Sequence, residues 1–164
     1  MQTLTAAPLT REAFAPFGDV IQVDDRVESF PINGGNTQRY HDQAQVQVLG
    51  DNARPIISIF RSQPYRFPIS LELLERHPQG SQAFMPINGG RFVVVVAPPG
   101  GTIRAEDIRA FVTNGQQGVN FHAGVWHHPM LALDRVGDFL VVDRAGDGNN
   151  CDERDLPCPM TVSG

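Results

Sequence analysis

The longest uninterrupted apolar run in this chain, residues 92–97, spans only six residues. Long stretches of helical periodicity are absent. Short apolar runs are instead separated by turns rich in glycine and proline, of which the chain has 16 and 13. This pattern is typical of many short strands joined by tight turns. At 164 residues the chain is long enough to bury a core as a single domain. The sequence therefore predicts an all-β barrel or double-sheet jelly roll with a few short helices.

The expected elements follow from local periodicity and turn chemistry. Thr10 is placed to cap a short helix over residues 11–15, which Pro16 then ends. Residues 69–76 fit a helix or a strand equally well, because their leucines match both periods. The remaining expectations are strands at 20–23, 43–48 (half-buried), 56–60 (more buried), 81–86, 92–97 (buried on both faces), 130–133 and 139–143, a hairpin turn at 88–90, a short helix at 105–111, and a polar surface tail over about 145–164.

Residues 114–129 hold the densest group of chemically active side chains. This stretch contains three of the five histidines, His122, His127 and His128, together with the only tryptophan, Trp126. Adjacent residues of a strand point to opposite faces, so at most one of His127 and His128 can look into a given pocket. Imidazoles act as metal ligands or as acid–base groups near neutral pH. Trp126 is most simply a core or wall residue.

Composition excludes several classes of function. All 13 cationic residues are arginine, so Schiff-base chemistry, a pyridoxal-phosphate anchor and a phosphate-loop lysine are ruled out. A net charge of −5 without a basic run argues against nucleic-acid binding, whereas arginine forks suit small organic acids. The N-terminus lacks the pattern of a signal peptide, and no run is long enough for a membrane span. The two cysteines are expected to be free thiols in a reducing cytosol.

A second polar group, residues 75–89, has the spacing of the first cupin motif, which is two histidines one residue apart, a glutamate five residues later and a closing glycine. Glu75 takes the place of the first histidine, His77 that of the second, and Gln82 that of the glutamate. The second cupin motif, a proline, a glycine and a histidine, resembles residues 122–127, with His127 at the histidine position and His122 in place of the proline.

Four runs make the resemblance more specific. They are R-Y-H-D at 39–42, E-R-H-P-Q-G-S-Q-A-F-M-P at 75–86, F-V-V-V-V at 92–96 and N-G-Q-Q-G-V-N-F-H-A-G-V-W-H-H-P at 114–129. Together they resemble the bacterial ureidoglycolate lyase family of the cupin superfamily, over most of the chain. The resemblance implies a cytoplasmic homodimer that splits (S)-ureidoglycolate into glyoxylate and urea in allantoin (purine) catabolism, with no nucleic-acid or membrane partner. It also implies a divalent metal cofactor, described for the family as nickel.

That reaction would need a base for the hydroxyl proton, an acid for the departing urea nitrogen and a group that orients the carboxylate. We expect His122 and Glu75 to be catalytic. Glu75, His77, Gln82 and His127 occupy the metal-ligand positions, a mixed nitrogen and oxygen set in which the neutral Gln82 amide is the weakest ligand. The expected substrate-binding residues are Arg39 and Arg76 for the carboxylate, Tyr40 at the mouth and Asn120 for the urea amide.

Plainer interpretations stay open for these residues. Glu75 and both arginines could be solvated surface groups, Gln82 an ordinary strand residue and Asn120 a turn residue. Two other functions also remain: a non-catalytic cupin that binds a small organic acid, and a different cupin enzyme such as an isomerase or a dioxygenase.

Overall fold

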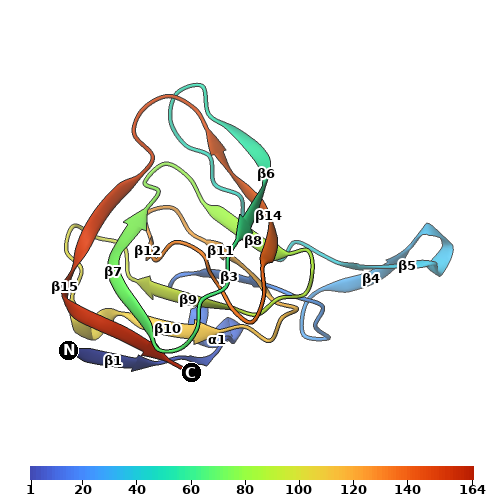
Figure 1. The fold of residues 1–164 in the computed structure, drawn as a ribbon. Coiled ribbons are helices and arrows are strands. Elements are labelled where there is room, and N and C mark those ends of the chain that lie inside the picture. The colour runs from blue at the N-terminus through green and yellow to red at the C-terminus, as the bar shows by residue number, and fades with distance from the viewer.

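The computed structural model describes residues 1–164 and contains two facing β-sheets (Figure 1). The larger sheet has the order β1-β15-β7-β12-β9-β10-β2, with β13 also paired to β9. Its strands are β1 (Gln2–Thr5), β2 (Ala7–Pro8), β7 (Ile69–Arg76), β9 (Phe92–Ala97), β10 (Arg109–Val112), β12 (Trp126–His127), β13 (Leu131–Ala132) and β15 (Asp152–Ser163). The smaller sheet has the order β3-β11-β8-β14-β6. Its strands are β3 (Gly18–Ile21), β6 (Arg54–Ser62), β8 (Gln82–Pro86), β11 (Gly118–Phe121) and β14 (Gly137–Ala145).

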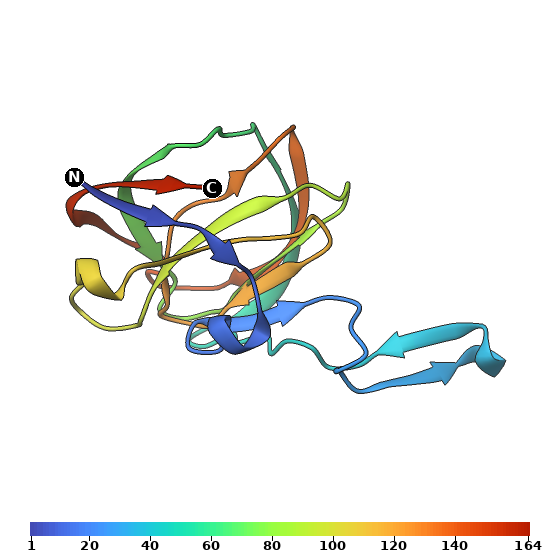
Figure 2. The ribbon, with the colours of Figure 1, turned by 90° about the horizontal axis from the view of Figure 1, so that it is seen from below.

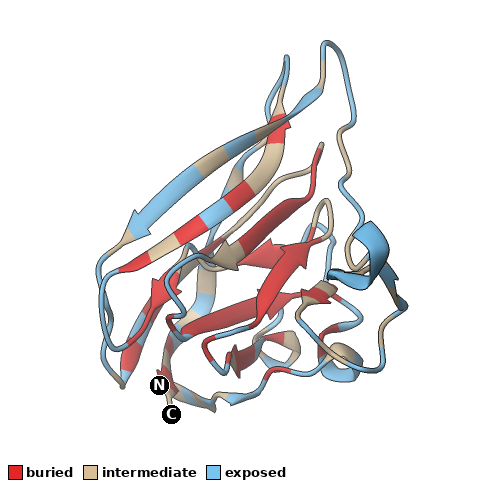
Figure 3. Cartoon of the chain, turned by 90° about the vertical axis from the view of Figure 1, so that its right-hand side faces the viewer, coloured by how far each residue is buried: buried red, intermediate tan, exposed pale blue.

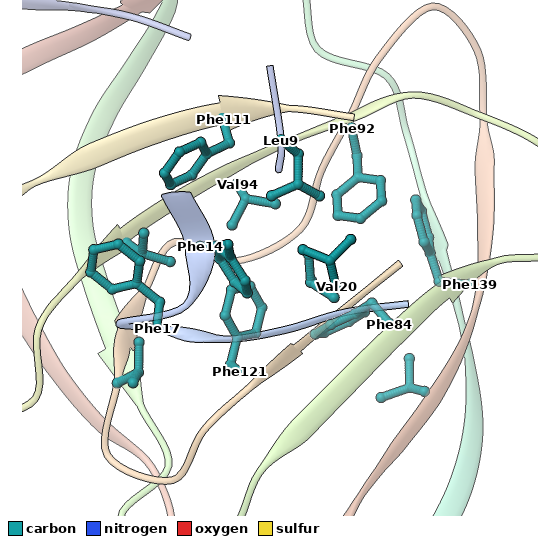
Figure 4. Packing of buried hydrophobic residues seen from close by; sticks show 14 of the residues in the cluster. Leu9, Phe14, Phe17, Val20, Phe84, Phe92, Val94, Phe111, Phe121 and Phe139 are labelled. Atoms are coloured by element: carbon teal, nitrogen blue, oxygen red, sulfur yellow. The ribbon is translucent and has the colours of Figure 1, made fainter. Parts of the chain in front are cut away.

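The two sheets enclose an aromatic core and form a nearly closed, cupin-like barrel, which confirms the predicted fold class. Alternate residues of each strand point inward. Phe84 with Phe121 and Phe92 with Phe139 form two edge-on pairs inside the barrel (Figure 4). Figure 3 shows the buried residues concentrated in the central strands. Every residue of β9 is buried, as predicted.

Helix contributes little to the structure. The helix α1 (Arg11–Phe14) begins where predicted, with Thr10 Oγ1 accepting a hydrogen bond from Ala13 N. Two 3-10 turns, η1 (Asn33–Gly35) and η2 (Ala105–Asp107), complete the set. The predicted helix at 105–111 is therefore wrong after its first turn, since the chain continues into β10. None of the helices has the length or apolar character needed to cross a bilayer.

A two-stranded arm extends away from the barrel. It consists of β4 (Ser29–Ile32) and β5 (Thr37–Tyr40), which pair with each other and with no strand of the barrel. The arm projects from the body in both Figure 1 and Figure 2. An isolated hairpin of this kind is marginally stable in water, so its surroundings in solution matter to its structure.

The predicted half-buried strand at 43–48 is wrong, apart from a single bridge between Val48 and Gly80. Away from that bridge and its two flanking backbone hydrogen bonds, Ser81 N to Gln47 O and Leu49 N to Gln79 O, side chains serve as the backbone's partners. Asp19 Oδ2 accepts from Gln45 N at 3.2 Å, and Ser81 Oγ accepts from Gln47 N at 2.7 Å. The alternation of glutamines with small apolar residues therefore belongs to a strap held by hydrogen bonds to side chains and, near residue 48, to the backbone of residues 79–81.

Three further expectations need correction. The turn at 88–90 joins β8 of one sheet to β9 of the other, so it is a crossover and not a hairpin turn. The strand at 56–60 exists as part of β6, but it is an edge strand, and Ile57 and Ile59 are exposed. The ambiguous residues 69–76 form strand β7.

The expected polar tail is also wrong, because most of it forms the long strand β15. This strand lies between β7 and β1, and it pairs antiparallel with β7 and parallel with β1. Met160 and Val162 point into a second apolar cluster with Leu71 and Ile69. Met160 and Val162, separated by one residue, show the alternation expected of a strand, but the surrounding residues are mostly polar and make it hard to recognise.

Met160→Ala should therefore destabilise the barrel by about 2–5 kcal/mol, because it removes a buried side chain and leaves a cavity. The measurement is the free energy of unfolding from urea denaturation. Asp155→Ala, at an exposed position of the same strand, is the matched control and should change that free energy by less than about 0.5 kcal/mol. Equal effects of the two substitutions would show that β15 does not pack on the barrel.

Candidate active site

A polar group at one end of the barrel combines residues from both sheets. Glu75 on β7 pairs directly with His127 on β12, and Gln82 on β8 pairs with Phe121 on β11. His77 follows the end of β7, and its carbonyl accepts a hydrogen bond from Gly124 N at 2.9 Å. Gly124 has φ +82°, a conformation that glycine adopts without strain, and this turn leads the chain into β12.

The two histidines and the glutamate converge closely. The ring centroids of His77 and His127 lie 5.2 Å apart. Glu75 Oε1 lies 3.9 Å from His77 Nε2 and 3.9 Å from His127 Nδ1. One candidate ligand atom from each of the three residues lies within 4.8 Å of the other two. Two donors of one metal ion at about 2.0–2.2 Å lie roughly 3.0–3.6 Å apart, so these groups, 3.9 Å apart, would need only a small inward shift to share an ion.

His127 is the most deeply buried of these groups. Its imidazole stacks on the Phe121 ring with centroids 4.2 Å apart and planes 3° from parallel. Burial lowers the pKa of His127 to about 3, so the ring is neutral and has a free lone pair. Its Nε2 is buried without any hydrogen-bond partner. An unpaired buried nitrogen on a neutral imidazole can bind a metal ion or accept a hydrogen bond from a ligand, although the ring nitrogen nearest Glu75 is the other one, Nδ1.

Glu75 is held between the buried site and the surface. Burial raises the pKa of its carboxyl, and the charge of nearby Glu153 acts in the same direction, whereas His77 opposes it. On the outer side, the Cys151 thiol lies 3.8 Å from Glu75 Oε2. A positive charge at the Glu75–His77–His127 group would offset the cost of burying this carboxylate.

An aromatic cavity of about 260 Å³ opens next to this group. Its polar wall contains Glu75, Gln82, His127, His128 and Ser62. The rest of its lining is apolar and consists of Phe60, Phe84, Phe92, Val93, Phe121, Pro129 and Met130. A small apolar cavity with a few polar groups at one end is the usual form of a small-molecule site. No arginine lines it.

The expectation that only one of the adjacent residues His127 and His128 faces the pocket agrees with the structure only in part. Trp126 points into the second apolar cluster, and His127 points inside the barrel, as alternation requires. His128 lies one residue beyond β12, however, and it lines the cavity together with His127. The chain leaves the strand at His128, so strict alternation no longer applies there.

Five of the expected site residues lie elsewhere. His122 and Asn120 are not in the cavity lining: both donate toward Asp19 Oδ2, at 3.1 Å each, and Asn120 also donates to Gln45 O at 2.8 Å. Asn120 is on the opposite face of β11 from Phe121, and His122 follows the end of that strand; both lie near the 43–48 strap. Both residues therefore lie outside the lining of the aromatic cavity.

The expected arginines and Tyr40 are also outside the cavity. Arg76 donates to Asp152 Oδ2 at 2.8 Å and to Gly100 O at 2.9 Å, and its guanidinium lies 4.7 Å from the centre of the Trp126 ring. Its hydrogen-bonding capacity is used in holding β7 to the neighbouring chain segments. Arg39 and Tyr40 belong to β5 of the projecting arm. In this arrangement of one chain, neither arginine reaches the cavity.

Other residues of the site were not expected. Asp143 on β14 accepts a hydrogen bond from Gln82 Nε2 at 3.1 Å, and Asn150 O lies 2.7 Å from His77 Nδ1. The sequence contains a signal for Asp143, since Phe139, Val141 and Asp143 share the inward face of one strand. A charged residue in that position marks a polar place inside the barrel. Nothing local indicates Asn150, because its role depends on β15 folding back to β7.

The fold and this group define a cupin-like barrel protein with a candidate metal site in a small aromatic cavity. Comparison with known proteins gives the family. A sequence profile described as ureidoglycolate lyase matches residues 1–163. The chain belongs to the ureidoglycolate lyase family, which confirms the resemblance found in the sequence.

Individual relatives agree with this assignment. A ureidoglycolate lyase of Pseudomonas savastanoi pv. phaseolicola is 56% identical over 153 residues, which cover 93% of this chain and 89% of that protein. One from Burkholderia mallei is 54% identical over 157 residues, 96% of this chain and 91% of the relative. One from Pseudomonas entomophila is 53% identical over 157 residues, 96% and 93% of the two chains.

His127→Phe tests the metal site with little change of shape, because a phenyl ring can keep the stacking on Phe121. We expect the variant to fold but to lose divalent-metal binding by more than the roughly 10–100-fold typical of losing an outer-shell partner. Isothermal titration of Ni²⁺ into metal-free protein measures this. His122→Asn is the control, and it should bind the ion like the parent protein. Loss of binding in the control alone would place the metal at the Asp19–His122 pair.

Proposed function

We propose that this protein cleaves (S)-ureidoglycolate into glyoxylate and urea, in allantoin catabolism. The observation that carries the proposal is the convergence of Glu75, His77 and His127 beside a small aromatic cavity, which Glu75 and His127 line. It is supported by relatives at 53–56% identity that carry the name ureidoglycolate lyase. The cavity is of a size for a small molecule, and most of its lining is apolar.

We propose that Glu75, His77 and His127 hold a divalent metal ion, and that the ion is nickel. Two imidazoles and a carboxylate suit borderline metals of this kind. When bound, the ion would supply positive charge to the substrate's carboxylate and hydroxyl oxygens. This role fits a cavity with no arginine in its lining and a chain that has no lysine. Ser62, at the cavity wall, can donate a hydrogen bond to the same carboxylate.

We propose His128 as the group that moves the proton, in place of His122. Its Nδ1 lies 2.8 Å from Pro129 O, so Nδ1–H donates there and the Nε2 lone pair is free. Nε2 accepts the substrate's hydroxyl proton as that oxygen forms the carbonyl of glyoxylate. The C–N bond breaks, its electron pair goes to the urea nitrogen, and the proton passes from Nε2 to that nitrogen. No net proton is gained or lost.

The first test is the identity of the products. Incubation of purified, metal-loaded protein with (S)-ureidoglycolate should release glyoxylate and urea in equal amounts and no ammonia. Coupled assays for the three products measure this. Ammonia released in step with glyoxylate, without urea, would mean hydrolase chemistry. Binding without any glyoxylate would favour a non-catalytic protein that recognises a small acid.

We propose that the protein is a homodimer formed through the outer face of the smaller sheet. Ile57 and Ile59 are 71% and 62% exposed on edge strand β6, and Leu140 on neighbouring β14 is 38% exposed. Ile59 and Leu140 are direct cross-strand partners, so these apolar side chains form one continuous patch. An apolar edge strand left open to water is prone to pair with another chain, and a second copy would cover it.

The dimer is tested by Ile59→Asp, which places a charge in the centre of that patch. Light scattering should give the parent protein a mass of twice 18.0 kDa and the variant a mass near 18.0 kDa. Val23→Asp is the control, because Val23 is 77% exposed but lies outside the patch, and its mass should match that of the parent. A parent protein that elutes as a single chain would refute the proposed interface.

We also propose a cytoplasmic location. Cys151 and Cys158 are both free. Unpaired thiols are typical of proteins in a reducing compartment.

A further inference from the structure

Gln82 and Asp143 are neighbours inside the barrel, although 61 residues separate them in sequence. They lie on the paired strands β8 and β14, one residue along from the Ala83–Val142 pair. Both share the inward face of their strand with core residues, Phe84 in one case and Val141 in the other. Asp143 does not line the cavity itself, whereas Gln82 does.

The hydrogen bonds fix the orientation of the Gln82 amide. A carboxylate only accepts hydrogen bonds, so the contact of 3.1 Å between Gln82 Nε2 and Asp143 Oδ2 requires the amide nitrogen to face Asp143. The amide oxygen must then point the other way. Oε1 lies 3.1 Å from His77 Nε2, a candidate ligand atom of the metal group. Without Asp143, either end of the amide could face His77.

Asp143 has no other partner that explains its position. Its Oδ1 is buried and makes no hydrogen bond, and it takes part in no salt bridge of the structure. The guanidinium of the next residue, Arg144, turns away to Leu49 O and Asp147 O. A shielded carboxylate without a cation is costly for the folded state. A bound cation beyond the Gln82 amide would reduce that cost.

We propose that Asp143 is a positioning residue that holds Gln82 with its amide oxygen toward the metal ion. The Gln82 amide oxygen then faces the proposed ion. The carboxylate charge that orients this amide lies on Asp143, on the far side of Gln82 from the ion. The inference rests on the proposed metal site but not on the lyase reaction.

Exchange of the two functional groups tests this arrangement. In D143N, the new side-chain amide at this position can donate or accept, so Gln82 loses its fixed orientation, and Ni²⁺ binding should weaken about 10–100-fold. In Q82E, two carboxylates face each other at the 3.1 Å contact, and binding should also weaken. In Q82E/D143N, the roles of donor and acceptor are exchanged, and a carboxylate oxygen points to the site. The double variant should bind Ni²⁺ at least as tightly as the parent protein.

The measurements are isothermal titration of Ni²⁺ into each metal-free protein and thermal unfolding of the same samples, with no substrate present. Asp138→Asn is the control, since Asp138 lies on the same strand but pairs with Arg61 at the surface. A purely structural role for Asp143 predicts lower thermal stability with unchanged Ni²⁺ affinity, and that result would overturn the proposal. A double variant that binds no better than Q82E would also overturn it.

A second measurement is independent of whether the variants fold. In a crystal structure of the nickel-loaded parent protein, Gln82 Oε1 should face the ion, with Nε2 still within hydrogen-bond distance of Asp143. A Gln82 side chain turned away from the ion, or an Asp143 that has lost contact with it, would overturn the proposal. So would a parent protein that binds no divalent ion while splitting ureidoglycolate, and in that case the lyase function would remain.

Discussion

The stacking of His127 on Phe121 links the core of the barrel to its candidate site. Phe121 belongs to the aromatic cluster that fills the space between the sheets, and its ring lies parallel to the imidazole at 4.2 Å. The two residues come from different sheets. Their separation therefore depends on how closely the sheets approach, which the phenylalanine packing around them sets (Figure 4). Glu75, paired with His127, and Gln82, paired with Phe121, take their positions from the same contact.

This dependence explains which parts of the site the sequence could predict. Glu75, His77, Gln82 and His127 follow a spacing pattern that reflects two strands meeting at one end of a barrel, and the structure brings all four together. His122 and Asn120 were assigned by their nearness in sequence to His127. Asn120 precedes Phe121 on β11 and His122 follows the strand, so alternation turns both away from the side on which Phe121 lines the cavity, whatever their nearness to His127 along the chain.

Errors in the fold have a related origin. The strap at 43–48 and the strand β15 each depend on contacts with distant segments, and these override local pattern. Asp19 and Ser81 supply acceptors that hold the strap without a strand partner, and neither is close to it in sequence. β15 is recruited by the open edge of β7 and by the pairing of β1 beside it, so its polar composition says little about its structure. The position of Arg39 and Tyr40 could not be predicted for a different reason. Their hairpin pairs with no strand of the barrel, and no local sequence signal indicates this.

The distribution of charge in the cavity has a consequence for how it can bind an acid. A carboxylate entering this cavity meets Glu75 and, behind Gln82, Asp143, but no arginine. Burial also disfavours the charged form of His127 and His128, and lowers the pKa of both. An anionic ligand would therefore be repelled by the protein alone, since two carboxylates in a shielded site are poorly compensated. A divalent cation at the Glu75–His77–His127 group would balance the two carboxylates, and it would lie closer to the entering ligand than Asp143 does. In this arrangement a bound ion would be part of the binding site for the acid as well as a source of catalytic charge, and an arginine inside the cavity would not be needed.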